Sequence, residues 1–560
     1  MDEDLLKKVK KLNAFHEIVD FPFSIQKEIL NMDETAQLFN VSVKTFIKLL
    51  KEESVPGRKI GREWRFSRKA LLDWLSVGDS KVYSSSESET KKYFDEVAPH
   101  LEEVRKIKSN PQALVMSKLK ELNKNMNILI KNVGIITGDL SVDYISNGFI
   151  GIKDGIIDFV GTSDEASRDF KYEKIIDGSN SIVMAGLVNA HSHSPMTILR
   201  NFADDLALEE WLFERVIPIE GKLLPEDIYW GTMLGITEMI KSGTTCFADM
   251  YMHMEEVAKA VLQSGIRANI SKGPLVSGFR GKEGISVDID GCSQYYKNWN
   301  NSANGRIKVY IEIHSVYLYG EETLREAASL AKQLGTGIHI HVLETIKEKE
   351  TSLEKYGMSV AQACLEFGIF DVPTIAAHCV HLTDNDIKIL ADRKVNAVHN
   401  PTSNLKLGSG ISRVPEMLDS GINVCLGTDG AASNNNLNMF EEMNLSALIH
   451  KGVKMNPQLI NADMAIKMAT ANGAKGLGFG EEIGSLKKGA KADLIILNID
   501  KPHLCPVNNP ISAIVYSAQA SDVETVIVDG KILMENRELK TIDEELVKAK
   551  VRGIARKLMG

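Results

Sequence analysis

The fold of the chain is best interpreted from one stretch, Leu187-Val-Asn-Ala-His191-Ser-His193-Ser194. An apolar run that ends in two histidines at i and i+2 puts both imidazoles on one side of an extended chain. Imidazole is a preferred ligand of zinc-like ions, so this spacing predicts the first half of a metal site. The same spacing also arises by chance on ordinary surfaces, so the interpretation requires further ligands elsewhere in the chain.

Residues 187–480 alternate apolar segments of strand length with amphipathic helical segments. The expected strands are the one that ends at His191, then 244–249, 306–314, 337–341, 373–378, 395–399 and 421–429. Repeated β-then-α units over such a length are typical of an α/β fold in which helices surround a parallel barrel. The sequence therefore predicts a (β/α)8 barrel over residues 187–480.

Polar residues fall at the C-terminal ends of these strands, the face on which such barrels build active sites. They are His191 and His193, His314, His341, His378, His399 and Asp429. A single strand-end histidine is more often structural, but five strands ending in histidine and one in aspartate favour a metal site. Imidazole and carboxylate ligands suit zinc-like ions, and His191, His193, His341 and Asp429 supply a reasonable set.

Glu344 lies three residues beyond His341, in His341-Val-Leu-Glu344-Thr345. This position faces the same pocket without being needed as a ligand, so we interpret Glu344 as a general acid and base. The alternative is a surface carboxylate, which its place beside a strand-end ligand disfavours.

Short β-rich runs flank the predicted barrel on both sides. They are 127–133, 148–160, 487–497 and 523–533, and Gly and Asp punctuate them as in hairpins. Their likeness predicts one small split β-sandwich domain, made from residues 126–186 and 481–545, with the barrel inserted between its halves.

A third module is expected over residues 30–77. Val43, Phe46, Ile47 and Leu50 recur at i, i+3, i+4 and i+7, as on one face of a helix, and a shorter helix precedes them. Pro56-Gly-Arg-Lys-Ile-Gly-Arg-Glu-Trp-Arg-Phe66 alternates apolar and basic residues about a Gly-containing turn, as in a hairpin wing. Together these elements predict a winged helix-turn-helix.

This module is basic within an acidic chain: between Lys44 and Asp73 nine Lys/Arg face four Asp/Glu, while the whole chain carries −9. A solvated basic face is the plain alternative, but the charges fall on the second helix and the wing, which favours DNA binding. The stretch resembles the excisionase and MerR-like winged helix-turn-helix family. The resemblance implies that Lys44, Thr45 and Lys48 face the major groove. It places Arg58, Lys59, Arg62 and Arg65 nearer the DNA backbone.

Residues 78–125 are expected to hold a polar linker around 84–90 and a helix with Phe94, Val97, Leu101 and Val104 at helical spacing. This helix is a docking or dimer contact, or simply packs on the next domain. The last is the plainer interpretation.

The composition bounds what the protein can be. With 560 residues, several domains are expected, and 44% hydrophobic with 25% charged residues is ordinary for a globular chain. No apolar run reaches the roughly 18 residues of a membrane span, and the N-terminus is not typical of a secretory signal. We therefore expect a cytoplasmic protein without a membrane partner, and a homo-oligomer. The six scattered cysteines predict neither a disulfide framework nor a cysteine-based zinc site.

Residues 126 to about 545 resemble the amidohydrolase superfamily. The similar branch contains S-adenosylhomocysteine and 5′-methylthioadenosine deaminases and related chlorohydrolases. The matching stretches are GLVNAHSHS, ALEEWLFERVIPIE, HVLET, AAHCVHL, HNPTSNLKLGSG and LGTDGAASNN, in that order. The resemblance implies one divalent ion per subunit, zinc or alternatively iron, bound by His191, His193, His341 and Asp429. No lysine ends the strand before His314 to bridge a second ion.

The resemblance also implies a reaction in which a metal-activated water attacks C6 of a purine and ammonia leaves. Asp429 would accept the water proton, Glu344 would protonate the ring nitrogen and His378 would orient the nucleophile and stabilise the tetrahedral intermediate. Trp211 and Glu220 are placed near the ribose, and His314 lines the pocket. Arg306 is expected to bind the carboxylate of a homocysteine tail.

Three functions stay open at this point. The first is a deaminase of S-adenosylhomocysteine, methylthioadenosine or adenosine that carries a DNA-binding module. The second is another hydrolase of the branch, a guanine deaminase or a chlorohydrolase. The third is a transcription regulator whose barrel only senses a purine, which the intact set of ligands and acid/base residues disfavours.

Overall fold

The structure is a computed structural model that describes residues 126–138, 143–162, 171–274 and 288–559, with short pieces between residues 29 and 71. It separates into two units, Met1–Leu122 and Asn123–Gly560, each with a hydrophobic core of its own. The linker and helix predicted over residues 78–125 lie outside the described residues. No described helix combines the length and apolar character needed to cross a membrane.

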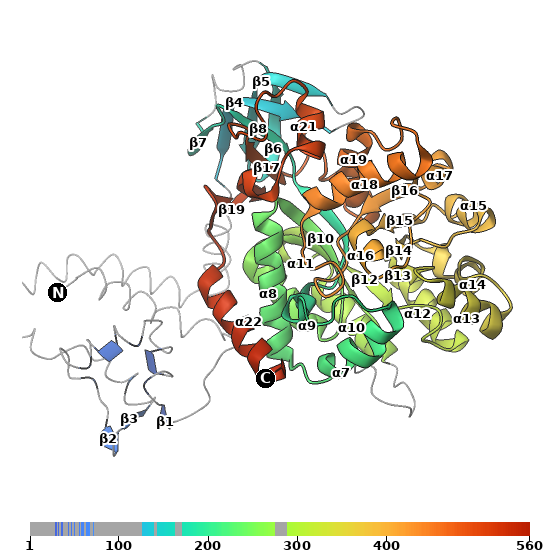
Figure 1. Cartoon of the computed structure of the whole chain (residues 1–560). Helices are drawn as coiled ribbons and strands as arrows, with labels where there is room; N and C mark the ends of the chain where they lie inside the picture. The colour runs from blue at the N-terminus through green and yellow to red at the C-terminus, as the bar shows by residue number, and fades with distance from the viewer. Residues whose placement is uncertain are drawn as a thin grey trace, which may run out of the picture. The chain divides into compact units, whose positions relative to one another are not determined.

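The larger unit is built around a parallel barrel (Figure 1), which confirms the predicted fold class. Its eight described strands follow one another around the barrel in sequence order. They are β9 (Leu187–Ser192), β10 (Thr244–Met250), β11 (Arg267–Lys272), β12 (Ile307–Ile313), β13 (Ile338–Val342), β14 (Thr374–His378), β15 (Asn396–His399) and β16 (Asn423–Leu426). Because the strands are parallel, their C-terminal ends meet at one face of the barrel.

Helices surround these strands. They include α8 (Pro225–Lys241), α9 (Met254–Ser264), α10 (Ile289–Trp299), α12 (Glu321–Leu334), α13 (Ile346–Tyr356), α14 (Val360–Glu366), α15 (Asp384–Asp392), α16 (Pro401–Lys406), α17 (Val414–Asp419), α18 (Met439–Lys454), α19 (Ala462–Ala469) and α20 (Ala471–Gly476). Shorter elements are η3 (Ser194–Leu199), the π-helix η4 (Glu210–Val216), α7 (Ile217–Glu220), α11 (Ser302–Gly305) and η5 (Ile369–Asp371).

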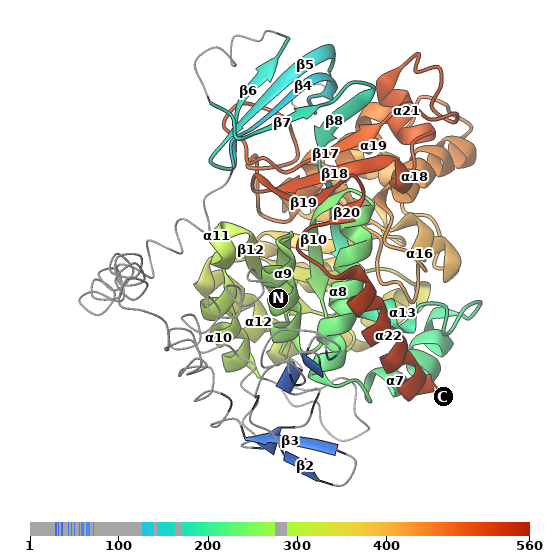
Figure 2. The same ribbon diagram turned by 90° about the vertical axis from the view of Figure 1, so that its left-hand side faces the viewer.

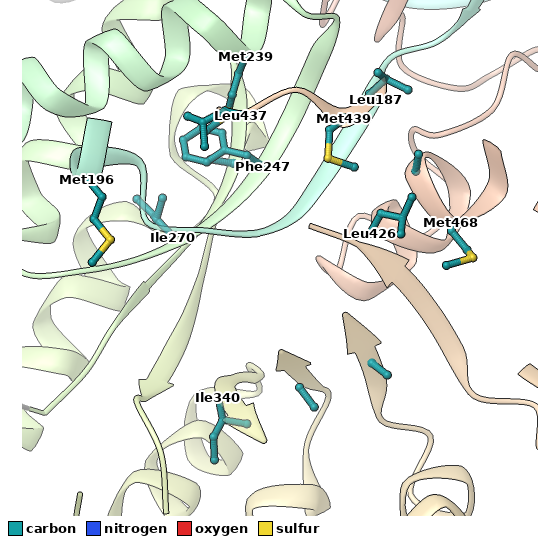
Figure 3. Close-up of a cluster of buried hydrophobic side chains, with 14 of the residues drawn as sticks. Leu187, Met196, Met239, Phe247, Ile270, Ile340, Leu426, Leu437, Met439 and Met468 are labelled. Atoms are coloured by element: carbon teal, nitrogen blue, oxygen red, sulfur yellow. The ribbon is translucent and has the colours of Figure 1, made fainter. Parts of the chain in front are cut away.

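The core lies on both faces of the barrel strands. Alternate strand residues such as Leu187, Phe247 and Ile270 point outward, where they meet helix residues such as Met239 and Met439 (Figure 3). The residues between them fill the barrel interior; they are Val188, Ala190, Cys246, Ala248, Tyr310, Ile375, Val398 and Cys425. Fully burying one large aliphatic side chain is worth about 1.5–3 kcal/mol, so this double burial fixes the strand register.

The sequence analysis located every described barrel strand except β11. The inward residues of β11 are Arg267, Asn269 and Ser271, all fully buried. Arg267 binds Asp493 through two hydrogen bonds, and Asn269 donates to the carbonyl of Leu477 at 3.0 Å. Because partners elsewhere in the chain bind these side chains, β11 is buried without the apolar pattern that marks its neighbours.

The segment after β16 returns to β9 and brings two site residues together. The backbone N–H of Asp429 donates to the carbonyl of His191 at 3.0 Å. Beside it, the side chain of Asn189 donates to the hydroxyl of Thr428 at 2.7 Å and accepts from the backbone N–H of Thr428 at 3.0 Å. A Cβ at Gly427 would lie 2.9 Å from the backbone nitrogen of His191, so glycine permits this close approach.

Both flanks of the barrel join one mixed sheet, drawn at one end of the barrel in Figures 1 and 2. Its nine-stranded path through the described residues runs β20-β19-β18-β17-β8-β4-β5-β6, with β7 on β4. The strands are β4 (Ile128–Ile136), β5 (Tyr144–Lys153), β6 (Ile156–Gly161), β7 (Lys174–Asp177), β8 (Ser181–Ala185), β17 (Leu494–Asn498), β18 (Val523–Val528), β19 (Lys531–Glu535) and β20 (Glu538–Leu539). The two halves meet where β8 and β17 pair antiparallel, with Ala185 opposite Leu494.

The sheet is fastened to the barrel beside this seam. Gly186 alone separates β8 from β9, and a Cβ there would lie 2.1 Å from Thr245. Asp493, just before β17, accepts from Arg267 of β11 at 2.6 and 2.9 Å, and both side chains are buried. C-terminal elements are α21 (Pro510–Tyr516), η6 (Ala520–Asp522) and α22 (Glu544–Met559), and α22 lies along α8 in both views.

The N-terminal unit contains the predicted wing. Strands β2 (Arg58–Ile60) and β3 (Glu63–Ser67) form an antiparallel hairpin, and β1 (Ile29–Leu30) pairs with β3. Val43, Phe46, Ile47 and Leu50 are helical, as predicted, but Val43 and Ile47 are 36% and 38% exposed. The small core is instead made by Leu30, Ala36, Phe46, Phe66 and Leu71.

Candidate metal and catalytic site

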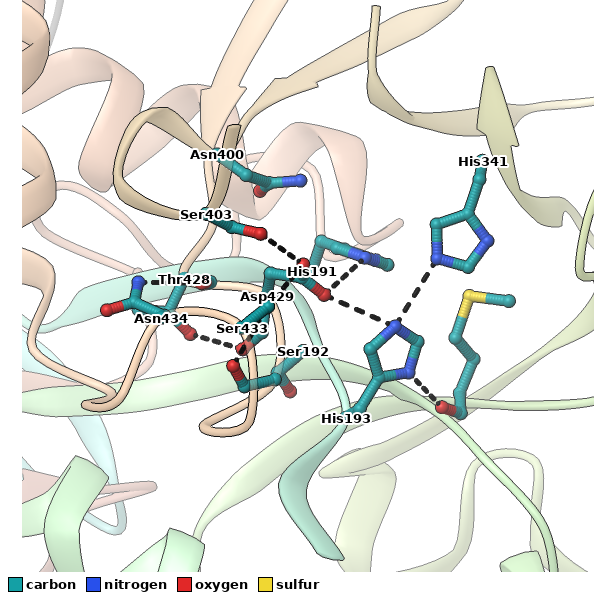
Figure 4. A network of polar contacts seen from close by, with 12 residues as sticks. His191, Ser192, His193, His341, Asn400, Ser403, Thr428, Asp429, Ser433 and Asn434 are labelled. Carbon is teal, nitrogen blue, oxygen red and sulfur yellow. Dashed lines mark hydrogen bonds and ion pairs between the residues drawn. The ribbon is translucent and has the colours of Figure 1, made fainter. Parts of the chain in front are cut away.

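The four expected metal ligands come together at the C-terminal face of the barrel (Figure 4). His191 Nε2 and His193 Nε2 lie 3.4 and 3.3 Å from the same Asp429 oxygen, Oδ1. His341 Nε2 lies 3.3 Å from His193 Nε2. Four donor atoms of three strand ends thus converge on one point.

The hydrogen bonds of these histidines leave their ligand atoms free. Nδ1–H of His193 donates to the carbonyl of Met250 at 2.6 Å, and Nδ1–H of His341 donates to the carbonyl of His314 at 2.7 Å. A carbonyl can only accept, so each ring carries its proton on Nδ1 and keeps the lone pair of Nε2 for a metal ion. His191 Nε2 is buried and has no hydrogen-bond partner among the described residues.

The electrostatics keep the ligands in their metal-binding forms. Burial lowers the pKa of His191 to about 4, although Asp429 opposes the shift, and burial also lowers the pKa of His341. Burial opposes ionisation of Asp429, yet the contacts of its Oδ1 with His191 Nε2 and His193 Nε2, at 3.4 and 3.3 Å, hold its pKa well below the usual value. Neutral imidazoles beside an ionised carboxylate are the donor set that a zinc-like ion takes, so the residues present fit the ion.

The second oxygen of Asp429 is held by two serines. Ser403 Oγ and Ser433 Oγ donate to Oδ2 at 2.6 and 2.8 Å. The backbone of Asp429 has a φ of +64°, and His378 has a φ of +72°. Residues other than glycine rarely adopt this left-handed backbone conformation, and such strain is typical of functional sites.

Glu344 and His378, the expected acid/base residues, lie beside each other in the site. His378 Nε2 lies 3.7 Å from Glu344 Oε2, and Ser409 Oγ donates to Glu344 Oε1 at 3.4 Å. Nδ1–H of His378 donates to Asn404 Oδ1 at 2.8 Å, which turns Nε2 toward Glu344. The pKa of Glu344 is raised, chiefly by burial, which favours the protonated form of this carboxyl. The pKa of His378 is also raised, because the charges of Glu344 and Asp429 outweigh burial.

A cavity of about 520 Å³ opens over these groups. Such a volume suits a small organic ligand. Trp211, Glu220 and His314 line it, together with Glu344, His378 and Asp429, as the sequence analysis expected. The indole N–H of Trp211 is buried and has no partner among the described residues, so it is free to donate to a ligand.

Arg306, which was expected to bind a substrate carboxylate, lies away from the cavity. Arg306 precedes β12, whereas His314 follows the other end of the same strand, and the cavity is at the His314 end. Its guanidinium is buried and donates to the carbonyl of Ile266 at 2.7 Å. Arg306 is not among the described residues that line the cavity, so it cannot bind a substrate carboxylate there.

The expected DNA-contacting residues are placed only in part. Arg58, Lys59 and Arg65 lie on the β2–β3 hairpin. The other four, Lys44, Thr45, Lys48 and Arg62, lie outside the described residues.

The family described as "Amidohydrolase family" matches residues 182–533. The chain belongs to the amidohydrolase family. A model described as "Helix-turn-helix domain" matches residues 29–76, the region of the β2–β3 hairpin.

Curated and solved relatives cover the amidohydrolase part almost completely. A protein of Acetivibrio thermocellus named 5-methylthioadenosine/S-adenosylhomocysteine deaminase is 65% identical over 434 residues, which are 78% of this chain and 100% of the relative. The structure of an adenosine deaminase from Xanthomonas campestris with bound zinc is 30% identical and covers 78% of this chain and 99% of its own, with a TM-score of 0.74. The atrazine chlorohydrolase of Arthrobacter aurescens shares the fold at 24% identity, with a TM-score of 0.71 over 76% of this chain and 100% of its own.

Several residues of this amidohydrolase site escaped the sequence analysis. Three of them lie inside stretches that resemble the family, so the sequence could have indicated them: Ser403, Asn404 and Ser433. Tyr251, just after β10, donates its hydroxyl proton to Glu220 Oε1 in the cavity, and no motif marks it. His339, two residues before His341, contacts His191.

Proposed function

We propose that this amidohydrolase deaminates adenosine-type nucleosides, S-adenosylhomocysteine and 5′-methylthioadenosine foremost, to their 6-oxo products and ammonia. One observation carries the proposal: the four expected metal ligands converge beside the Glu344–His378 pair, at a cavity whose lining includes His193, His341, Asp429, Trp211 and Glu220. The name of the 65% identical relative supports the choice of substrate.

We assign one zinc ion per subunit to His191, His193, His341 and Asp429, with iron as the alternative. The zinc-bound adenosine deaminase, which is 30% identical, supports zinc. A divalent ion in such a site lowers the pKa of water toward neutrality, and this is the chemistry it supplies.

The chain's own residues then carry the protons. Asp429 accepts a proton from the attacking water, and Glu344 protonates the ring nitrogen next to C6, which makes C6 more electrophilic. His378 donates through Nε2–H to the oxygen that gains charge as the O–C6 bond forms. When the C6–N bond breaks, the amino group leaves as ammonia with the proton that Asp429 took from the water. The proton of the C6 hydroxyl passes to Glu344 as the C6=O bond forms, which restores the acid. One water is consumed for each ammonia released.

The substrate body is held by cavity residues. Glu220 accepts from ribose hydroxyls and Trp211 donates its indole N–H, which has no described protein partner. A guanine deaminase or chlorohydrolase would not need a carboxylate to read a ribose. A purine sensor would not need the carboxyl of Glu344 as a proton donor beside His378.

The test is a direct assay of the purified full chain after its metal content has been measured. Loss of the adenine absorbance is followed with S-adenosylhomocysteine, methylthioadenosine and adenosine, with guanine and a chlorinated triazine as controls. We expect turnover of the adenosine-type substrates. Metal-loaded protein that turns over none of them would contradict the proposal.

We also propose that the helix-turn-helix unit binds duplex DNA through its basic hairpin and second helix. The local excess of positive charge and the matching helix-turn-helix model support it. A cytoplasmic location and a homo-oligomer stay predictions.

A further inference from the structure

The three histidines of the metal site differ in what holds their second ring nitrogen. His193 and His341 donate to backbone carbonyls, those of Met250 and His314. His191 instead meets another side chain, since its Nδ1 lies 2.9 Å from Nε2 of His339. Both rings are fully buried. A mutation can therefore remove the partner of His191, which is not possible for a backbone carbonyl.

The direction of this hydrogen bond follows from the task of His191. Nε2 of His191 faces Asp429 and has no hydrogen-bond partner among the described residues, so it is the atom available to a metal ion. A ring that offers the Nε2 lone pair carries its proton on Nδ1. His191 must then donate, and His339 must accept through Nε2.

The chain of contacts continues one residue further. If Nε2 of His339 accepts, its proton sits on Nδ1, and Ser271 Oγ lies 3.5 Å from that atom. His191, His339 and Ser271 come from β9, β13 and β11, so the contacts cross the barrel interior. His339 is not among the described residues that line the cavity, so it does not touch a substrate there.

We propose that His339 is a positioning residue that fixes the tautomer and ring orientation of His191 for metal binding. The inference rests on the metal site of the proposed function. Partners of this kind typically change metal affinity by about 10- to 100-fold when they are removed. His339 would thus act on the ion only through His191.

The experiment compares three full-length variants with the wild type. His339→Leu keeps the bulk and removes the acceptor, whereas His339→Gln keeps an amide oxygen at a similar reach. His450→Leu is the matched control, because His450 is 2% exposed, pairs with His399 at 3.4 Å and does not line the described cavity. Zinc affinity is measured by competition with a chromophoric chelator, and thermal melting of the apo forms reports folding.

We expect His339→Leu to bind zinc about 10- to 100-fold more weakly. His339→Gln should recover most of the affinity, and His450→Leu should bind as the wild type does. Wild-type affinity in folded His339→Leu would overturn the inference, as would equal weakening in the Leu and Gln variants. A wild type that binds no zinc would contradict the metal site itself, and hence the proposed function.

A second readout covers the case in which His339→Leu does not fold. Cobalt(II) replaces zinc in the wild type, His339→Gln and His450→Leu, and the visible absorption bands are recorded. An amide oxygen accepts less strongly than imidazole, so the bands of His339→Gln should shift. Unchanged bands in His339→Gln would overturn the inference, and the bands of His450→Leu should stay in place.

Discussion

The carboxylate of Glu348 accepts a hydrogen bond from the backbone N–H of Glu344, with 2.8 Å between Oε2 and the nitrogen. Glu348 is the third residue of α13, whose first turn is capped by the Thr345 hydroxyl through a bond from the Glu348 N–H. The start of one helix therefore holds the backbone of the acid/base residue.

Glu348→Ala should lower kcat while Glu348→Gln retains most of it. The alanine variant leaves the Glu344 N–H without this acceptor, a loss of about 1 kcal/mol or roughly fivefold. The glutamine oxygen still accepts. Steady-state kinetics at pH 7 checks this, and equal loss in both variants would contradict it.

The same residue predicts a pH dependence of stability. Burial raises the pKa of Glu348 from 4.5 to about 8, so the folded state binds more protons than the unfolded state between these values. The contribution of Glu348 is fully present below about 4.5 and is lost as the pH rises through about 8. The amide of Glu348→Gln does not ionise, so the melting temperature of this variant, relative to that of the wild type, should increase as the pH rises from 4.5 through about 8. A constant difference would rule out the shift.

Glu344→Gln should abolish deamination and leave the metal bound. The amide cannot deliver a proton to the purine, and general acid catalysis contributes about 10²- to 10⁴-fold. Metal content by mass spectrometry separates loss of chemistry from loss of the ion. Full activity in this variant would refute the role of Glu344.

Tyr251→Phe should raise KM more than it lowers kcat. The Tyr251 hydroxyl donates to Glu220 Oε1, which leaves the other oxygen of Glu220 for the ribose. Losing one hydrogen bond costs about 1 kcal/mol, or roughly fivefold in kcat/KM. A double-mutant cycle with Glu220→Gln is the check, since the two effects should not add. Additive effects would show that Tyr251 acts independently.

Asp493→Asn should destabilise the protein by about 3–5 kcal/mol. The buried guanidinium of Arg267 would lose the negative charge of Asp493 and keep only one amide oxygen as an acceptor there. Asp529, 3.7 Å from Arg267, moderates the loss. Chemical denaturation measures it, and the exposed pair Arg325–Glu321 serves as control, since Glu321→Gln should leave the midpoint nearly unchanged. A midpoint of Asp493→Asn equal to the wild type would argue against the anchoring role.

Arg65→Ala in the full chain should weaken DNA binding and flatten its salt dependence. Each lost phosphate contact lowers the slope of log K against log salt by about 0.9. Fluorescence anisotropy with a duplex at several salt concentrations measures the slope. Lys297→Ala, an exposed change on α10, should not alter it. An identical slope for both variants would speak against contact by the hairpin.

Much of the barrel and of the candidate metal site could be predicted from the sequence, because polar residues at the ends of apolar strands are easily seen. His191, His193, His341 and Asp429 converge where the parallel strands predicted them to. The strand β11 was not predicted because its inward residues are polar and bind partners far along the chain, such as Asp493 for Arg267.

The position of Arg306 away from the cavity has a different cause. Arg306 and His314 are close in sequence, but they flank β12, whose residues rise about 3.3 Å each. The length of β12 therefore places Arg306 and His314 at opposite ends of the barrel, although they are close in sequence. Partners such as Tyr251 and His339 escaped because their contacts are set by packing across strands, which no local pattern reveals.

The pairing of β8 with β17 sets a constraint on how the molecule is made. β8 leads through Gly186 into the strand that carries His191, while β17 is synthesised only after the whole barrel. Until then one edge of β8 has no strand to pair with, and open edges invite association with other chains. The nascent protein thus carries an unpaired edge of β8 directly beside the strand of His191 until β17 has been made.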